Sequence, residues 1–370
     1  MGLSIIGLVM FSGCVQDDSS NTQSTIPTLK VAYLPTDHHA SLFVAAKNPD
    51  LFKNDGIYLK EIESKKKYEL YDNNKKVADV ELIQINEGGA KIMALMTQDQ
   101  IDIGFNGVPP AVFAIDKGTK AKIIGAVNSE GSAVVVRKEI PVNNWDEFVN
   151  YIKEQHKKGE QVKIGHPLPV SIQYVMIKKA LEYENITYTE KTDDSAMVKL
   201  INCKGQGAMP NLLSTKELDA VIAWEPTPEV ISIKDIGKVI VYSHNLPPKG
   251  EWANHPCCVL VASEDALAKK SDAVNSFLKL MKISTNKINE NISLAIESSS
   301  NWLGVDKEVE QKSVPNIGYI TNPKSVEKGT VDFVMVLNSQ NSLTGVLKNV
   351  GEEEAKNILF DMGPYDKITK

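Results

Sequence analysis

This sequence has no long apolar run beyond its first residues and no excess of positive charge. After Phe11 no apolar stretch approaches the roughly 18 residues that a membrane-spanning helix requires. The formal net charge is −6, so the chain carries no overall basic field of the kind that attracts nucleic acid. We therefore expect the body of the protein to fold in water and to have no nucleic-acid partner.

Cysteine is also scarce, with only four residues in the chain, at positions 14, 203, 257 and 258. They make no even disulfide framework, because Cys257 and Cys258 are neighbours and a bridge between adjacent residues strains the peptide that joins them. Spacings typical of metal sites, such as CxxC and HxxxH, are missing. Stability must therefore come from the hydrophobic core, and the sequence predicts no cofactor.

The chain begins with an uncharged apolar segment, residues 1–11, that runs into Ser12-Gly13-Cys14. This order resembles the lipobox of exported lipoproteins, although the basic residues that usually precede the apolar segment are missing. It predicts a signal peptide over 1–13 and a lipidated tether over 14–27, with the lipid on Cys14. A short buried or interfacial segment is the alternative, but it leaves the polar, Ser/Thr-rich stretch after Cys14 unexplained.

The remaining length and pattern predict two domains of the α/β class. At 370 residues the chain exceeds the ~250–300 residues at which a single core usually stops growing. From Thr28 onward, short apolar runs alternate with helical patterns, which favours mixed, mainly parallel sheets flanked by helices. We expect strands at 29–34 and 57–63, a helix at 40–46, and a hairpin inserted at 64–80.

Two later stretches resemble each other, each with a helical pattern, a tight polar turn and a strand that begins near an aspartate. One covers 89–104 and the other 207–221. Their separation is far larger than the ~20–50-residue period of a solenoid. They indicate two α/β lobes of related design, although a chance similarity of two such units is the alternative.

Two β-rich segments, 132–137 and 256–263, are placed where strands would cross between the lobes as a hinge. We therefore predict that lobe 1 comprises 28–131 and 258–370, and that lobe 2 comprises 132–257. The segment from 264 to 302 is helical in pattern and should pack back on lobe 1.

Several of these segments together resemble the solute-binding proteins of ABC transporters for nitrate, sulfonates, taurine and thiamine-pyrimidine precursors. The resemblance covers about residues 28–270. It rests on the order of the following segments: Leu29-Lys30-Val31-Ala32-Tyr33-Leu34-Pro35, Leu42-Phe43-Val44-Ala45-Ala46, Leu51-Phe52-Lys53-Asn54-Asp55-Gly56-Ile57, Ile101-Asp102-Ile103-Gly104 before Gly107, Glu130-Gly131-Ser132, and Leu218-Asp219-Ala220 leading into Trp224-Glu225-Pro226.

The resemblance implies a two-lobe fold of the periplasmic-binding-protein type (type II), with two hinge strands and a ligand held in the cleft between the lobes. It implies delivery of that ligand to an ABC permease and its ATPase, from a protein anchored by its lipid at the extracytoplasmic face of the cell membrane. It also aligns His39 with a cleft histidine of the pyrimidine-precursor branch.

Ligands of open α/β sheets bind beyond the carboxyl ends of the strands, where loops lead into helix N-termini. Exposed amides at helix starts favour an anionic group. Four such loops and the hinge supply the candidate ligand-binding residues, which are Thr36, His38, His39, Asn106, Gly107, Ser132, Ser171, Trp224 and Glu225.

Six of these nine candidates also have a plain structural interpretation. Trp224 could pack between the lobes, Glu225 could orient the backbone, and His38 could stabilise its loop by a hydrogen bond. Asn106-Gly107 is also a turn signature, and Ser132 could simply belong to the hinge.

The segment from Asn254 to Cys258 is the most unusual local cluster, because it places His255 next to two thiols. With His38 and His39, these are ligand types that zinc or copper accepts. Successive residues of a strand point to opposite faces, however, so both cysteines should not face one metal. We therefore predict small buried cysteines in a hinge strand, and no metal site.

The leading hypothesis is a monomeric binding protein for a small anion, with no reaction performed on it. No arginine stands in the candidate loops, so recognition would depend on amides, hydroxyls, histidine and indole rather than on a bidentate fork. An aminopyrimidine stacked on Trp224 and bonded to Glu225 is the alternative ligand. Other classes are a sensor, a metal-binding protein, a pyrimidine-synthase-type enzyme, and a hydrolase that uses Cys257 or Cys258 with His255.

Overall fold

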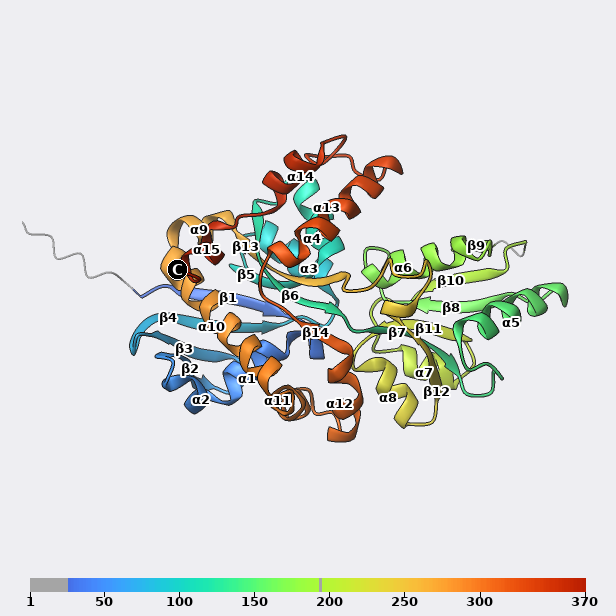
Figure 1. The fold of residues 1–370 in the computed structure, drawn as a ribbon, viewed down its shortest axis with the longest axis horizontal. Coiled ribbons are helices and arrows are strands. Elements are labelled where there is room, and N and C mark those ends of the chain that lie inside the picture. Colours follow the sequence, from blue (N-terminus) through green and yellow to red (C-terminus); the bar gives the residue numbers. More distant parts are fainter. Residues whose placement is uncertain (1–25, 193–194) are drawn as a thin grey trace, which may run out of the picture.

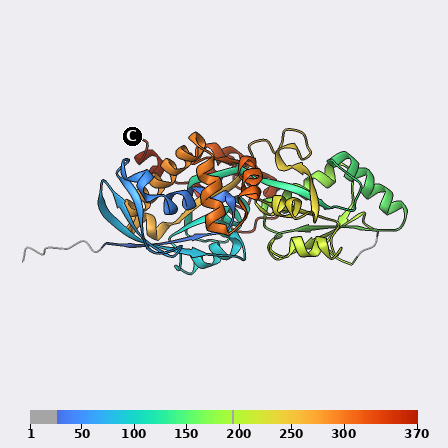
Figure 2. The same ribbon diagram turned by 90° about the horizontal axis from the view of Figure 1, so that it is seen from below.

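The computed structural model describes residues 26–192 and 195–370. The predicted signal peptide and Cys14 lie outside these residues. Two sheets organise the described chain (Figure 1), and they lie side by side along the long axis of the molecule (Figure 2). The N-terminal strands and the C-terminal helices share one lobe, and the middle of the chain forms the other.

The first sheet has eight strands and belongs to lobe 1. In spatial order these are β14 (Ile317–Tyr319), β6 (Ala121–Glu130), β13 (Pro256–Ser263), β5 (Ile103–Gly107), β1 (Thr28–Tyr33), β4 (Lys75–Gln84), β3 (Lys67–Asp72) and β2 (Ile57–Glu63). The second sheet has six strands and belongs to lobe 2: β12 (Gly237–Tyr242), β7 (Ser132–Arg137), β11 (Ala220–Trp224), β8 (Val162–His166), β10 (Val198–Asn202) and β9 (Tyr188–Thr189).

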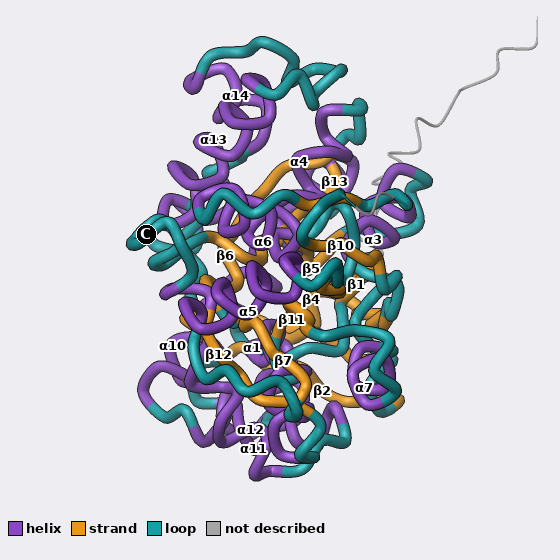
Figure 3. Tube along the Cα trace, turned by 90° about the vertical axis from the view of Figure 1, so that its right-hand side faces the viewer, coloured by secondary structure: helices purple, strands orange, loops and turns teal. Residues whose placement is uncertain are grey.

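Helices pack on both faces of each sheet, because the strands carry apolar side chains on both faces. Seen along the long axis, strands lie in the middle of the molecule with helices around them (Figure 3). In β1, Val31 points into one core and Ala32 into the other. The first core of lobe 1 takes side chains from α1 (Ala40–Lys47), α10 (Ser271–Glu290) and α11 (Ser293–Leu303). The second takes them from α3 (Gly89–Thr97), α4 (Val108–Asp116), α13 (Lys324–Ser339) and α14 (Glu352–Leu359).

Lobe 2 repeats this arrangement on a smaller scale. One face of its sheet packs on α5 (Trp145–Lys157) and α6 (Ile172–Tyr183), and the other on α7 (Met209–Ser214) and α8 (Thr227–Ile233). The shorter elements of the two lobes are η1 (Asp37–His39), α2 (Pro49–Lys53), η2 (Ser243–Asn245), α9 (Glu264–Lys269), α12 (Lys307–Ser313), η3 (Val314–Asn316) and α15 (Gly363–Lys367). None of the helices in the described residues combines the length and the apolar character needed to cross a bilayer.

Local predictions from the sequence are largely confirmed. The strand expected at 57–63 is β2, and the expected hairpin is the antiparallel pair β3 and β4. Its turn is formed by Asn73 and Asn74, whose φ angles of 49° and 58° lie in the left-handed region that asparagine tolerates. The helix expected at 40–46 is α1.

One expectation about the sheets needs correction. Parallel pairing prevails in the second sheet, but in the first it is limited to β5, β1 and β4. The hairpin adds antiparallel strands at one edge, and β13 returns from lobe 2 to pair antiparallel with both β5 and β6. The first sheet is therefore mixed, as predicted, but mainly antiparallel, because a strand that returns directly from the other lobe needs no helical crossover.

The chain passes between the sheets at two places. Only Gly131 separates β6 from β7, and the segment 243–255 joins β12 to β13. Gly131 has a φ of 77°, a conformation that favours glycine. The predicted hinge segments begin at these passages, while the exact lobe boundaries stay a prediction.

Candidate ligand-binding cleft

A cavity of ≈ 50 Å³ lies between the two lobes. By the same measure one water occupies roughly 10–15 Å³, so the cavity has room for a few waters or one compact solute. Its lining comes from the β1–η1 loop, η1, the first turns of α3, α4 and α6, the loop before α6, the end of β11 and the start of β13. The lining residues are Leu34, Thr36, His38, Gly89, Gly107, Pro110, Leu168, Val170, Ser171, Ile172, Gln173, Trp224, Cys257 and Cys258.

Five of the candidate ligand-binding residues line this cavity: Thr36, His38, Gly107, Ser171 and Trp224. The Oγ of Ser171 accepts a hydrogen bond from the Tyr174 amide at the start of α6. Because that hydroxyl caps the helix, the first turn of α6 is presented to the cavity.

The other four candidates lie behind the lining. His39 is buried against Phe105, and burial together with the charge of His38 lowers its pKa to about 3. Asn106 is buried under Gly89, and neither atom of its amide has a partner within the described residues. Ser132 accepts a hydrogen bond of 2.9 Å from Gln173, so it acts on the cavity through that side chain.

Glu225 turns its side chain away from the cavity and into a buried group of carboxyls. Its Oε1 accepts a hydrogen bond of 2.9 Å from Asn316, and its backbone carbonyl accepts one of 2.7 Å from Thr36. Both contacts join lobe 2 to lobe 1. The pyrimidine contact considered for Glu225 would therefore require this side chain to move.

The neighbours of Glu225 are Asp37 and Glu310, both buried. Burial and the charges of Asp37 and Glu225 raise the pKa of Glu310 to about 10. Burial also raises the pKa of Asp37, whose carboxylate is bonded to Ser313, and burial together with Glu229 raises that of Glu225. We expect this group to hold protons at neutral pH, because three buried carboxylates cannot all be charged.

Gln173, Cys257 and Cys258 are the lining residues with reactive or hydrogen-bonding side chains that the sequence did not assign to the cleft. The helix start at Ser171 could have pointed to Gln173, which is its second residue. The expected alternation of side chains along a strand predicted that the two cysteines would not both face the cleft.

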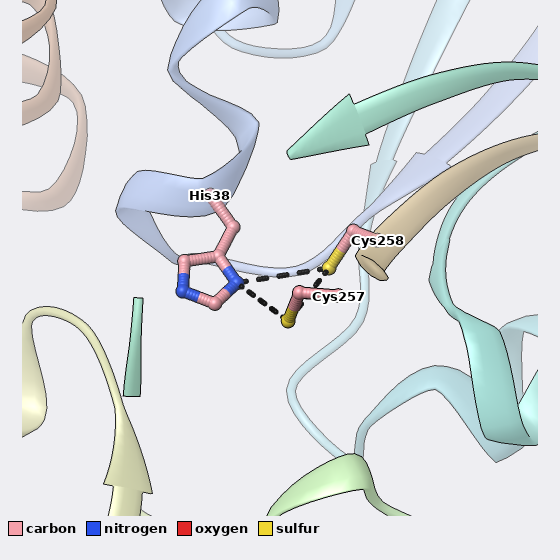
Figure 4. Close-up of side chains that lie close together, drawn as sticks. All are labelled: His38, Cys257 and Cys258. Atoms are coloured by element: carbon pink, nitrogen blue, oxygen red, sulfur yellow. Dashed lines mark hydrogen bonds between the residues drawn. The ribbon is translucent and has the colours of Figure 1, made fainter. Parts of the chain in front are cut away.

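The two thiols and His38 meet at one point, with both sulfurs pointing at the imidazole (Figure 4). His38 Nδ1 is 3.4 Å from Cys257 Sγ and 3.7 Å from Cys258 Sγ, and the two sulfurs are 3.9 Å apart. All three side chains are buried. Among the described residues they form a group of donor atoms close enough to share one metal ion.

The expectation that the cysteines face opposite sides is wrong, and a β-bulge is the reason. Against β6, Pro256 pairs with Ser129 and Cys258 with Asn128, so Cys257 is an extra residue in β13. Such a residue interrupts the alternation of side chains. Cys257 and Cys258 consequently present their sulfurs to the same imidazole.

Electrostatics couple the three groups. The hydrogen bond from Cys258 and the neighbouring imidazole of His38 hold the pKa of Cys257 well below its usual range, although burial opposes this. Burial alone would lower the pKa of His38, but the Cys257 sulfur and the Gly131 carbonyl raise it. Cys258 is the proton donor of the pair, and its pKa is raised. His255 lies nearby, with a pKa lowered by burial.

Two α/β lobes with a cavity between them define the fold of the periplasmic binding proteins. The ligand-binding component of an ABC-type import system from Staphylococcus aureus, solved with zinc bound, has this fold at a TM-score of 0.70 and 16% identity, over 92% of this chain and 99% of that one. The periplasmic nitrate-binding protein of Synechocystis PCC 6803 has it at a TM-score of 0.68 and 12% identity, over 93% of this chain and 89% of that one.

The sequence places the chain more narrowly. A model of the NMT1-like family matches residues 22–294, and the chain belongs to that family. An uncharacterized protein of Methanocaldococcus jannaschii is 56% identical over 131 residues, which are 35% of this chain and 88% of that protein. The fold and the family predicted from the sequence are thus confirmed.

Proposed function

We propose that the protein captures a small anion in the cleft and hands it to an ABC permease with its ATPase, performing no reaction on it. Nitrate, or a small sulfonate such as taurine, is the proposed class of ligand. In this proposal the chain acts as a monomer at the extracytoplasmic face of the cell membrane and is held there by the lipid on Cys14.

The observation that carries the proposal is the convergence of three helix N-termini on one cavity. Gly89 begins α3, Gly107 caps α4, and Ile172 and Gln173 begin α6; all four line the cavity. The N-terminus of a helix carries about half a positive charge and unpaired amides. Each such terminus favours a nearby anion by ~0.3–1 kcal/mol at the surface and by more in a closed site.

The size of the cavity also supports an anion of compact size. The cavity volume of ≈ 50 Å³ suits nitrate better than a long alkanesulfonate.

A second candidate is an aminopyrimidine of the thiamine-precursor type. The apolar part of the lining, with Trp224 beside Leu34, Leu168 and Ile172, favours a flat ring over a strongly hydrated ion. The carboxyl of Glu225, which such a ring was expected to bond, is instead buried and turned away from the cavity towards Asn316.

Thermal unfolding of the purified chain tests both candidates, with nitrate, bicarbonate, taurine, alkanesulfonates and hydroxymethylpyrimidine added separately. A ligand at 100 times its Kd stabilises the folded state by ~2.7 kcal/mol, which raises Tm by several degrees. A selective rise with an anion supports the proposal, and a rise only with the pyrimidine supports the second candidate. No rise with any of them contradicts both.

A matched pair of variants ties the effect to the cleft. Gln173→Ala removes a buried side chain of the lining, whereas Gln311→Ala changes an exposed residue of α12. We expect the ligand-dependent rise in Tm to shrink in the first and to persist in the second.

A further inference from the structure

We propose that His38, Cys257 and Cys258 form a three-ligand site for zinc(II) on the lobe 1 wall of the cavity, with a fourth coordination position open to the captured solute. The metal site itself is independent of the function proposed above. Only its last element, coordination of the solute, rests on that function.

The spacing of the donor atoms fits a zinc ion. Bonds of about 2.3 Å to sulfur and about 2.0–2.1 Å to nitrogen, arranged tetrahedrally, place two sulfurs about 3.8 Å apart and a sulfur and a nitrogen about 3.5 Å apart. The observed separations are 3.9 Å between the sulfurs and 3.4 and 3.7 Å from the sulfurs to His38 Nδ1. The three atoms thus already stand at the corners of one face of a coordination tetrahedron.

The orientation of His38 is fixed from behind, as in many metal-binding histidines. Its Nε2 lies 2.8 Å from the backbone carbonyl of Gly131. Because a carbonyl can only accept, Nε2 carries a proton, and in the neutral ring the lone pair of Nδ1 is directed at the sulfurs. A backbone carbonyl bonded to the second nitrogen is a common support for an imidazole ligand.

The backbone fixes the two sulfurs as well. The bulge that brings Cys257 and Cys258 to one side lies in β13, which is paired on both edges, with β5 and with β6. Thiolates are soft donors and imidazole suits zinc and copper, so this set of donors selects zinc or copper(I) over magnesium or calcium. No carboxylate belongs to the lining of this cavity.

An open fourth position would give an anionic solute a partner that the lining of the cavity otherwise lacks. The lining contains no lysine and no arginine, and Arg137, the single arginine of the chain, is paired with Asp219 in lobe 2. A zinc ion with two cysteines and one histidine keeps one position for water or an anionic oxygen. A copper(I) ion would be complete with three ligands and would offer the solute no position.

The test begins with the full-length chain, reduced and stripped of metal, and titrated anaerobically with zinc(II) and with copper(I) against competing chelators. Cobalt(II) serves as a spectroscopic probe, because thiolate coordination gives charge-transfer bands. We expect one zinc per chain and two-thiolate cobalt bands. Cys257→Ser, Cys258→Ser and His38→Gln should each weaken zinc binding more than about 100-fold, since loss of even an outer partner costs about 10–100-fold. Cys203→Ser, which removes the half-buried thiol of lobe 2, should bind like the parent.

Four results would overturn all or part of the proposal. If the parent binds zinc no more tightly than the Cys257→Ser/Cys258→Ser double variant does, the proposed zinc site does not exist. If the mass of the protein before reduction is lower by two hydrogens, and the reduced protein binds no zinc, the two cysteines form a disulfide instead. Copper(I) held with zinc excluded would replace the metal. Zinc binding with nitrate affinity unchanged by the metal would remove the coordination of the solute.

Failure of the proposed function looks different from failure of the metal site. If none of the offered solutes bind with or without zinc, the proposed capture function fails while the titration still decides the site.

Discussion

Trp224 is held in the cleft by its backbone rather than by its ring. Gln206 accepts a hydrogen bond of 3.0 Å from the Trp224 amide and donates one of 2.9 Å to its carbonyl. The indole lines the cavity and is only half-buried. The side chain can therefore be removed without disturbing the strand end, so its role is open to a direct test.

We predict that Trp224→Ala weakens binding of the cleft ligand at least about tenfold, because the flat indole face provides contact area of the kind worth more than 1 kcal/mol. Titration calorimetry with the ligand found by thermal unfolding measures the change, and the Tm of the free variant should stay close to that of the parent. Unchanged affinity would show that the indole only packs between the lobes.

Glu310 offers a second test at this scale, through the pH dependence of stability. Its pKa is about 10 in the folded protein against an ordinary value of 4.5. Between these values the unfolded chain releases a proton that the folded protein keeps, so the free energy of unfolding falls as pH rises. Asp37, Glu225 and Tyr319 are the titratable groups that face it.

Glu310→Gln keeps the neutral form at every pH, so we expect the variant to gain stability over the parent as pH rises from 6 to 9. The gain for one proton is at most about 1.4 kcal/mol per pH unit. Urea unfolding at several pH values measures it, with Glu308→Gln, exposed on the same helix, as the control. Parallel pH profiles of parent and Glu310→Gln would show that Glu310 is ionised in the folded protein.

At the scale of elements, the junction of β6 and β7 decides where His38 lies. Gly131 forms this junction and accepts the hydrogen bond of the imidazole. A Cβ added to Gly131 would lie 2.5 Å from His38 Nε2 and 2.9 Å from Ile317. Glycine is therefore required here both by the backbone conformation and by the close approach of the ring.

Gly131→Ala should destabilise the protein more than Gly118→Ala does. Both positions have a positive φ, 77° and 96°, so both variants carry similar backbone strain, but a Cβ at Gly118 would meet nothing within 4 Å. Overpacking typically costs an additional 1–3 kcal/mol, which urea unfolding resolves. Equal losses of unfolding free energy in the two variants would mean that the loop carrying His38 shifts to make room for the Cβ at little cost.

The elements themselves were largely readable from the sequence, because their signals are local. The hairpin predicted over 64–80 and the helix predicted over 40–46 are both present. The bulge in β13 was not, because it depends on pairing with β6 rather than on the residues of β13. Without this bulge, Cys257 and Cys258 would face opposite sides of the strand, which is what the sequence predicted.

At the scale of the whole molecule, the lobes are joined by contacts around Glu225 as well as by the two chain passages. Thr36 and Asn316, both in lobe 1, bond this one residue of lobe 2. In a two-lobe binding protein such contacts bias the equilibrium between open and closed forms, and ligand affinity is coupled to that equilibrium.

Asn316→Ala should weaken ligand binding by about 2–13-fold, which corresponds to the 0.5–1.5 kcal/mol of one hydrogen bond made in the closed form. Asn316 does not line the cavity, so the effect would come from the lobes. Asn338→Ala removes two bonds of the same length, 2.9 Å, that stay within lobe 1. It is the matched control, because Asn316→Ala likewise removes a second bond, to the Lys312 carbonyl. Small-angle scattering should report a larger radius of gyration for Asn316→Ala alone. Identical radii of gyration would show that the Asn316–Glu225 bond does not hold the lobes together.

The sequence by itself determined the α/β class, the family, most elements and the chain passages, because periodicity, caps and turn residues act over a few neighbours. Tertiary structure alone decided which candidates face the cleft. His38 meets Cys257 across 219 residues of sequence, and Glu225 is turned inward by Asn316 across 91. Such meetings depend on how two sheets are placed and on one bulge between paired strands, and no local pattern in the chain encodes either of them.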